Sequence, residues 1–221
     1  INAYEPNGQI NAEEWLKTGK ENNIPCMNDC AADVPPVENL WKFTQMGYDL
    51  VCFSGGKGLR GPQSAGLLLG KKELIAAARL SAPPRGNTVG RGMKVNKEEV
   101  LGMWAALEAF VNGDHEKEWK LWEGQINLIA EAVKGIDGLT LKIHVPPIAN
   151  HIPTLDLSWD TKKVKISGNG LKDVLRSGHP SIEVAGGGEN SVSITTWMMR
   201  PGQERIVADR IREGLEKAAA G

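Results

Sequence analysis

A single lysine stands among glycines in the segment "DLVCFSGGKGLRGPQSAGLLLG", residues 49–70. Lys57 follows the apolar run "DLVCF", and Ser54 lies three residues before it. Earlier in the chain, Asp29 follows a shorter apolar run, "IPCM", and precedes the small residues "CAA". The ends of parallel strands open onto the same sheet edge, so an amine, a carboxylate and a hydroxyl could meet there and carry acid–base or covalent chemistry.

Four roles are open to Lys57. An ordinary solvated loop lysine is the commonest case, but it leaves the neighbouring glycines unexplained. A nucleotide phosphate loop is excluded, because it requires Ser or Thr after the lysine and Gly58 stands there. A structural ion pair remains open. The fourth role is a Schiff base with an aldehyde cofactor, for which the glycines would leave the lysine room to change partners.

Pyridoxal phosphate (PLP) is an aldehyde cofactor whose requirements these residues could meet. It acts as an electron sink only while its ring nitrogen stays protonated, and a buried carboxylate such as Asp29 would keep the proton there. Its phosphate needs hydroxyl and backbone N–H donors, and Ser54 is a candidate. The order of Asp29, Ser54 and Lys57 on consecutive apolar runs therefore favours a PLP site.

The elements that must position these residues are strands alternating with amphipathic helices over residues 1–80. This pattern predicts an α/β sheet covered on both faces. Asn11 and Asn96 each stand three residues before a glutamate and are expected to cap helices. The expected strands are "IPCM", "DLVCF" and "AGLLLG", and further helices are expected from Pro35 and over "KKELIAAARL".

From Leu139 the pattern changes to mostly alternating strands, which predicts a small α+β domain. The expected strands are "LTLKIHV", "TLDLSW", "IEVAG" and "VSITTWMM", with helices at "GLKDVLRSG" and from Pro201. We therefore predict part of a large domain at residues 1–85, connecting helices at 86–135, and a small C-terminal domain at 136–221. Trp119 and Trp122 fall on a helical period and are expected in the core.

Composition limits the class of protein. The chain has 221 residues, 41% hydrophobic and 24% charged, with a formal net charge of −1, which argues against tRNA as a partner. Neither a transmembrane helix nor a signal sequence is expected, since no apolar run approaches 18 residues. Cys26, Cys30 and Cys52 are interpreted as reduced core thiols of a cytoplasmic protein. No histidine or cysteine pair has metal-ligand spacing, so no metal site is assigned.

The blocks "IPCMNDCAADVPP" and "YDLVCFSGGKGLRGPQSAGLLLGKKELI" resemble fold-type I PLP enzymes, and within them the selenocysteine synthase (L-seryl-tRNA selenium transferase) family. That family has an Asp-Ala-Ala strand end, then Ser-Gly-Asp-Lys or Ser-Gly-Gly-Lys, then Gly-Pro-Gln. Its later motif Arg-Ala-Leu-Arg-Val-Asp-Lys corresponds to "RGMKVNK", residues 91–97. The resemblance covers most of the chain and is strongest over residues 24–107. It implies the C-terminal half of an aspartate-aminotransferase-like α/β fold.

The resemblance also implies roles for individual residues. Lys57 would form the Schiff base, Asp29 would pair with the pyridine nitrogen, and Ala31 would lie under the cofactor ring. Ser54 would help hold the phosphate, and Gln63 would shape the loop beyond the lysine.

The residues expected to face an anionic substrate group are Arg91 and Lys94. Lys94 stands where the family has arginine, so it keeps the charge but loses the bidentate geometry. Arg200, just before Pro201, is either a partner for a substrate carboxylate or a surface residue.

The first half of a fold-type I enzyme carries a phosphate loop and the ring-stacking residue, so we expect this chain to be the C-terminal part of such an enzyme. Lys57 would remove the α-proton of a small anionic amino compound. Elimination with replacement gives a transferase, elimination alone a lyase, and amino transfer is a third branch. A homo-oligomer with the active site at the subunit interface is expected. The rivals are an inactive PLP-fold binding or dimerisation module and a plain scaffold with an idle Lys57.

Overall fold

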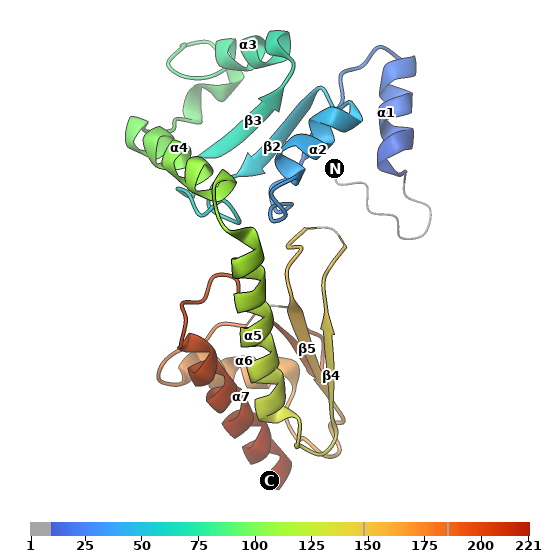
Figure 1. The fold of residues 1–221 in the computed structure, drawn as a ribbon, viewed down its shortest axis with the longest axis vertical. Helices are drawn as coiled ribbons and strands as arrows, with labels where there is room; N and C mark the ends of the chain where they lie inside the picture. Colours follow the sequence, from blue (N-terminus) through green and yellow to red (C-terminus); the bar gives the residue numbers. More distant parts are fainter. Residues whose placement is uncertain (1–9, 148, 185) are drawn as a thin grey trace. The chain divides into compact units, whose positions relative to one another are not determined.

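The computed structural model describes residues 10–147, 149–184 and 186–221. The chain divides into two compact units (Figure 1). Unit 1 contains the described residues up to 113 together with 147–151, and unit 2 contains 114–146 with 152–221. The division falls between two consecutive helices, and the predicted domain boundaries after residues 85 and 135 stay predictions.

Unit 1 places its strands in the order β1-β2-β3. β2 pairs parallel with β1 and antiparallel with β3, so the sheet is mixed. Its elements are α1 (Ala12–Glu21), β1 (Met27–Asp29), α2 (Asn39–Met46), β2 (Leu50–Ser54), β3 (Gly66–Gly70), α3 (Lys72–Leu80), the 3-10 helix η1 (Val89–Gly92) and α4 (Lys97–Val111).

The two faces of the unit 1 sheet differ in burial. Asn28, Val51 and Phe53 are buried on one face, where Val51 and Phe53 join the core of this unit with residues of α2 and α4. On the other face Met27 is 46% exposed and Leu68 is 37% exposed. Within the described residues, this second face is therefore less completely covered than the first, although Leu50 and Cys52 on it are half-buried.

The helix ends of unit 1 follow local sequence signals. The Asn11 side chain accepts a hydrogen bond from the N–H of Glu14 at 2.8 Å, which confirms the predicted cap of α1. Asn96 and Glu99 form the predicted capping box of α4. Gly47, with φ 112°, ends α2 in the left-handed region that glycine favours.

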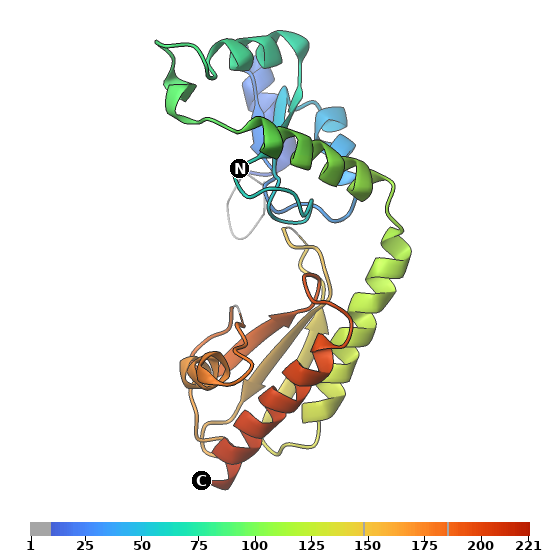
Figure 2. The same cartoon turned by 90° about the vertical axis from the view of Figure 1, so that its left-hand side faces the viewer.

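Unit 2 contains a second sheet, which is antiparallel with strand order β4-β5-β6. Its helices α5 and α7 lie side by side (Figure 2). Its core combines apolar residues of the strands and the helices, among them Ile126, Leu155 and Leu215. Its elements are α5 (His115–Val133), β4 (Leu139–His144), β5 (Thr154–Trp159), α6 (Gly168–Ser177), β6 (Ser191–Thr195) and α7 (Gln203–Ala220).

Several predicted elements are shifted or absent. The strand expected at "IPCM" begins only at Met27 and runs to Asp29, and the helix expected from Pro35 begins at Asn39. The described residues of "IEVAG" form no strand, since the N–H of Ile182 bonds to the carbonyl of Leu175 instead of a ladder partner. Ala185 of this segment lies outside the described residues.

The three cysteines are free thiols, as predicted, with Cys26 and Cys30 buried and Cys52 half-buried. Trp122 is buried and Trp119 half-buried. Within the described ranges, no helix combines the length and the apolar character that crossing a membrane would require.

Candidate active site

The carboxyl ends of β1 and β2 bring the candidate residues to one edge of the unit 1 sheet. Asp29 is the last residue of β1 and pairs in register with Cys52 of β2. Ser54 is the last residue of β2, and Lys57 follows it in the turn of residues 55–59. Because the two strands are parallel, Asp29 and the segment from Ser54 to Lys57 leave the sheet at the same edge.

Asp29 is held on one of its two carboxylate oxygens. Its Oδ1 accepts the N–H of Ala31 at 3.1 Å and the thiol of Cys52 at 3.6 Å. Asp29 is exposed, and its Oδ2 accepts no hydrogen bond from the residues that the structure describes. A fixed carboxylate with one open oxygen fits the chemistry of a partner for a protonated ring nitrogen.

Lys57 is exposed, and its ammonium has no hydrogen bond or ion pair within the described part of the chain. The backbone around it is ordered by hydrogen bonds. The carbonyl of Lys57 accepts the N–H of Arg60 at 2.9 Å, and the N–H of Gly61 bonds to the carbonyl of Gly55 at 2.7 Å. Arg60 has φ 56°, so this turn includes a non-glycine residue in the left-handed region. The turn therefore presents a side chain that is free to bind a group at this edge.

The glycines around Lys57 serve close packing, a role that the sequence did not reveal. A Cβ at Gly55 would lie 2.5 Å from the carbonyl oxygen of Ala65 and 2.6 Å from the sulfur of Met103. A Cβ at Gly56 would lie 2.3 Å from Oε1 of Gln63, whose Nε2 donates to the carbonyl of Gly56 at 3.1 Å. These contacts fix the loop backbone, so lysine mobility is not needed to account for these glycines.

Helix α4 anchors the loop that follows Lys57. The hydroxyl of Ser64 donates to the carboxylate of Glu99. A Cβ at Gly102 would approach Cγ of Pro62 to 3.0 Å, so glycine permits close contact there. Glu99 is the capping-box residue of α4, and that local signal did not reveal its second contact to Ser64.

Three of the other candidates lie at this edge: the N–H of Ala31 bonds to Asp29, Ser54 ends β2, and the side chain of Gln63 bonds to the carbonyl of Gly56. Within the described residues, no side-chain hydrogen bond or ion pair joins Arg91 or Lys94 to this edge. Ala31 and Ser54 are half-buried, whereas Gln63 is exposed. Arg91 in η1 and Lys94 just after it are also exposed.

Arg200 belongs to unit 2 and is exposed before α7. Its backbone N–H donates to Oε1 of Gln203 at 2.9 Å.

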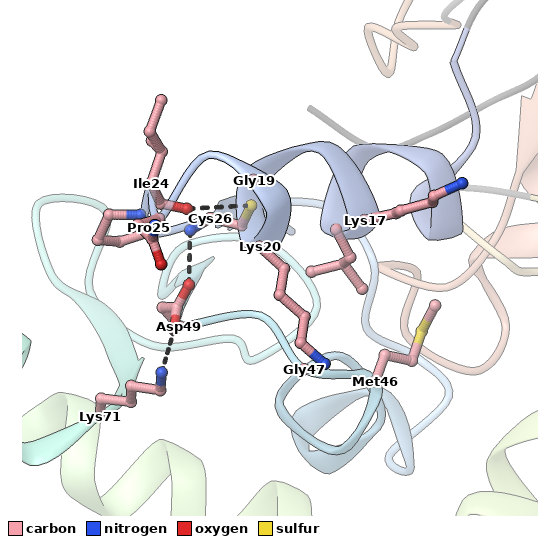
Figure 3. A pocket seen from close by; sticks show the side chains of 12 residues that line it. Lys17, Gly19, Lys20, Ile24, Pro25, Cys26, Met46, Gly47, Asp49 and Lys71 are labelled. Atoms are coloured by element: carbon pink, nitrogen blue, oxygen red, sulfur yellow. Dashed lines mark hydrogen bonds and ion pairs between the residues drawn. The ribbon is translucent and has the colours of Figure 1, made fainter.

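A large cavity of unit 1 lies at the other end of the sheet (Figure 3). Its volume is about 550 Å³, and it is lined by residues that flank the starts of β1 and β2 and the end of β3, among them Cys26, Asp49 and Lys71. Figure 3 shows Lys71 pointing toward Asp49, with Nζ 2.6 Å from Oδ1. Cavity volume therefore does not mark the edge where Asp29 and Lys57 emerge.

The family model of L-seryl-tRNA selenium transferase matches residues 7–136, more than half of the chain. The chain belongs to this family. The D-glucosaminate-6-phosphate ammonia lyase of Salmonella typhimurium is 26% identical over 214 residues, which are 96% of this chain and 54% of that enzyme. The L-seryl-tRNA(Sec) selenium transferase of Geobacter metallireducens is 36% identical over 111 residues, covering 46% of this chain and 22% of that one.

Solved structures show the fold. A D-glucosaminate-6-phosphate ammonia-lyase matches with a TM-score of 0.74 and 24% identity, covering 97% of this chain and 55% of that chain. A serine palmitoyltransferase (SPT) structure with the PLP internal aldimine matches with a TM-score of 0.57 and 14% identity, covering 98% of this chain and 54% of that chain. This confirms the predicted fold-type I class. The chain spans about half the length of these relatives.

Family and fold together imply PLP as the cofactor, which confirms that prediction. The relatives are named as an ammonia lyase and selenium transferases, so the family is one of enzymes. Within the described ranges, no cluster of three His, Cys, Asp or Glu side chains could hold a metal ion.

Proposed function

We propose that the protein is a PLP-dependent enzyme that removes an α-proton from a small anionic amino compound and then eliminates a leaving group, with ammonia-lyase chemistry as the first choice. The observation that carries the proposal is the shared edge of β1 and β2. Asp29, with its open Oδ2, and Lys57, with its free ammonium among the described residues, both emerge there. An amine and a carboxylate at this edge are the minimum that such chemistry requires.

Each candidate residue of this chain would have a separate role in binding the cofactor or in transferring the proton. When bound, PLP supplies an electron sink for the charge left on the substrate carbon. Asp29 would accept the hydrogen bond of the ring N–H through Oδ2, while Ala31 and Cys52 hold Oδ1. Ser54 would donate its hydroxyl to the cofactor phosphate. Lys57 would bind the cofactor aldehyde and, once displaced, accept the α-proton at Nζ.

The α-proton step needs a neutral Lys57 amine. In this structure the side chain is exposed, so the required desolvation must come from bound cofactor and substrate and from the rest of the enzyme. Gln63, bonded to the carbonyl of Gly56, would keep the loop backbone in place during this exchange of partners.

The exposed cationic side chains of Arg91 and Lys94 favour an anionic amino compound as the substrate class. Arg91 and Lys94 are exposed, and neither side chain is paired within the described residues. The ammonia lyase relative is named for an amino sugar phosphate, which combines an amine with an anionic group. Arg200 is a further candidate for the anionic group.

Selenium transfer to seryl-tRNA is the second candidate, and the family model favours it. The formal net charge of −1 argues against it, since proteins that bind nucleic acid usually present an excess of basic residues. Both the lyase and the transferase would carry out an elimination, so the two candidate functions differ in substrate: a small amino compound or a seryl-tRNA.

A homo-oligomer is part of the proposal. Val100, Leu101 and Trp104 of α4 are 56%, 62% and 62% exposed, which leaves an apolar helix face uncovered in the isolated chain. Burial of this face against a second copy would support an active site formed at the subunit interface.

The test is cofactor capture on Lys57. The purified protein, with the upstream part of its gene included, is mixed with PLP, reduced with borohydride and digested for mass spectrometry. We expect a pyridoxyl group on Lys57 and none in Lys57→Ala, with the exposed lysine variant Lys94→Ala as a matched control that keeps the label. Absence of label from Lys57 in the extended protein would overturn the proposal.

Substrate class is tested on the PLP-loaded protein before any borohydride reduction, because the reduced lysine can no longer exchange its partner. Release of ammonia from D-glucosaminate 6-phosphate and related amino sugar phosphates would support the lyase, whereas turnover of seryl-tRNA alone would select the transferase. Light scattering on the same sample reports the oligomeric state, and a monomer would contradict the proposed interface.

A further inference from the structure

The loop that follows β1 is held by a segment more than 100 residues away in the sequence. Asp33 is only 4% exposed, and its Oδ1 accepts the N–H of Ala149 at 3.1 Å. The N–H of Asn150 donates to the carbonyl of Ala32 at 2.7 Å. Segment 149–151 lies between β4 and β5 in sequence but belongs to unit 1. Two hydrogen bonds therefore tie it to the loop of residues 30–33.

The backbone of this segment is unusual. Ala149 has φ 53° and Asn150 has φ 46°, so two successive non-glycine residues occupy the left-handed region. Such residues persist only where surrounding contacts fix them. Both of them direct their N–H groups to the loop, to Asp33 and to Ala32. The strained backbone and the two bonds thus belong to one arrangement.

Asp33 also connects the loop to its own surroundings. Its carbonyl accepts the side-chain N–H of Asn39 at 2.6 Å, which joins the loop to α2. Its carboxylate hydrogen-bonds the thiol of Cys30, whose pKa is raised by burial and then by the negative charge of Asp33. At the start of the loop, the N–H of Ala31 bonds to Asp29. The loop is therefore fixed at Asp29 by one end and at Asp33 by the other.

We propose that Asp33 is a positioning residue, which clamps segment 149–150 to loop 30–33 and thereby fixes the orientation of the Asp29 carboxylate. The importance of this clamp for cofactor binding rests on the proposed function. Asp33 itself touches neither cofactor nor substrate in this scheme. Its effect passes through Ala31, because displacement of the loop removes the N–H that holds Oδ1 of Asp29.

The experiment compares Asp33→Ala and the milder Asp33→Asn with Glu38→Ala, a matched loss of one exposed carboxylate five residues later. Hydrogen exchange without PLP is followed in peptides that cover residues 29–34 and 149–153. Alkylation of Cys52 reports on Asp29, since the two side chains are hydrogen-bonded. For Asp33→Ala we expect about tenfold faster exchange in both peptides, as for one lost buried hydrogen bond, and several-fold faster alkylation.

The exchange and alkylation rates of Asp33→Asn should fall between those of the wild type and of Asp33→Ala, because its amide oxygen still accepts the N–H of Ala149. The rates of Glu38→Ala should equal those of the wild type. Unchanged exchange at 29–34 and unchanged alkylation in a folded Asp33→Ala protein, checked by circular dichroism, would overturn the clamp. If Asp33→Ala fails to fold, the same readouts on Asp33→Asn decide.

Borohydride labelling of Lys57 at limiting PLP separates this inference from the proposed function. Less label in the Asp33 variants than in Glu38→Ala supports positioning of the cofactor site. Equal labelling of Lys57 in Asp33→Ala, Asp33→Asn and Glu38→Ala would overturn the proposed positioning role of Asp33. If the wild-type protein takes no label, the proposed function and the cofactor role of Asp33 both fail, while the exchange data still decide whether the clamp exists.

Discussion

The thiol of Cys52 lies 3.6 Å from Oδ1 of Asp29, on neighbouring parallel strands and at paired positions of the sheet. Burial raises the pKa of Cys52 above its ordinary value, and the charge and hydrogen bond of Asp29 raise it further. A neutral thiol can donate, so Cys52 helps to hold in place the carboxylate that we assign to the cofactor.

The first prediction concerns the reactivity of Cys52. Asp29→Asn removes the negative charge that, after burial, raises the thiol pKa, so alkylation of Cys52 by iodoacetamide at pH 8 should accelerate several-fold. Peptide mass spectrometry measures each cysteine separately. The fully buried Cys30 serves as the internal control and should stay unmodified. An unchanged Cys52 rate in Asp29→Asn would contradict the contact.

The second prediction concerns Gly55, two residues before Lys57. Gly55→Ala would place its Cβ 2.5 Å from a backbone oxygen, which cannot move away as a side chain can. We expect a loss of about 1–3 kcal/mol in the free energy of unfolding. Gly124→Ala in α5 is the control, because its Cβ would meet nothing within 4 Å. This variant should raise the free energy of unfolding by at most about 1 kcal/mol. Urea denaturation followed by circular dichroism measures both, and equal stabilities would show that the loop is not closely packed.

The third prediction is a pH dependence carried by Glu99. Its hydrogen bond from Ser64, and then that from the N–H of Asn96, lower its pKa in the folded state. A lowered pKa adds stability at neutral pH that is lost as the pH falls through the folded-state value. Glu99→Gln should therefore lower Tm at pH 7 and make little difference in acid. Glu98→Gln, whose ion pair to Lys97 is almost fully exposed, should change little at either pH.

A gap in Tm between Glu99→Gln and the wild type that does not shrink as the pH falls would contradict this account, since the stability added by the lowered pKa is lost as Glu99 takes up a proton.

The fourth prediction concerns Asp49 at the cavity of Figure 3. Lys71 and the N–H of Cys26 each lie 2.6 Å from one of its oxygens, and these bonds lower its pKa, with the Lys71 bond as the larger cause. Asp49→Asn should reduce Tm at pH 7, and the difference should shrink as the pH falls through the lowered pKa.

The matched control is Asp137→Asn. Asp137 also pairs with a lysine, Lys163 at 2.9 Å, but its side chain is 84% exposed. Solvent screens such a pair, so its loss should alter Tm little. If Asp49→Asn alters Tm as little as Asp137→Asn does, the less exposed ion pair of Asp49 with Lys71 adds no more stability than an exposed pair.

Much of the secondary structure could be predicted because its signals are local. Asn11 and Asn96 cap helices through bonds that span three residues, and Gly47 ends α2 through its own φ. The failures have equally specific reasons. The strand at "IPCM" starts late because the carbonyl of Cys26 accepts the N–H of Asp49 before the ladder begins, a contact between distant residues.

By itself the sequence determined which chemistry is available. It supplied a lysine among glycines, a carboxylate after the preceding strand, and their order along the chain, and these indicated the PLP family. The tertiary structure alone decided what fixes them. Packing of Met103 against Gly55, and the bond of Asp33 to a residue 116 positions later, join parts of the chain that no local period connects. Such contacts form only once the chain has closed long loops, so short-range sequence patterns carry no signal of them.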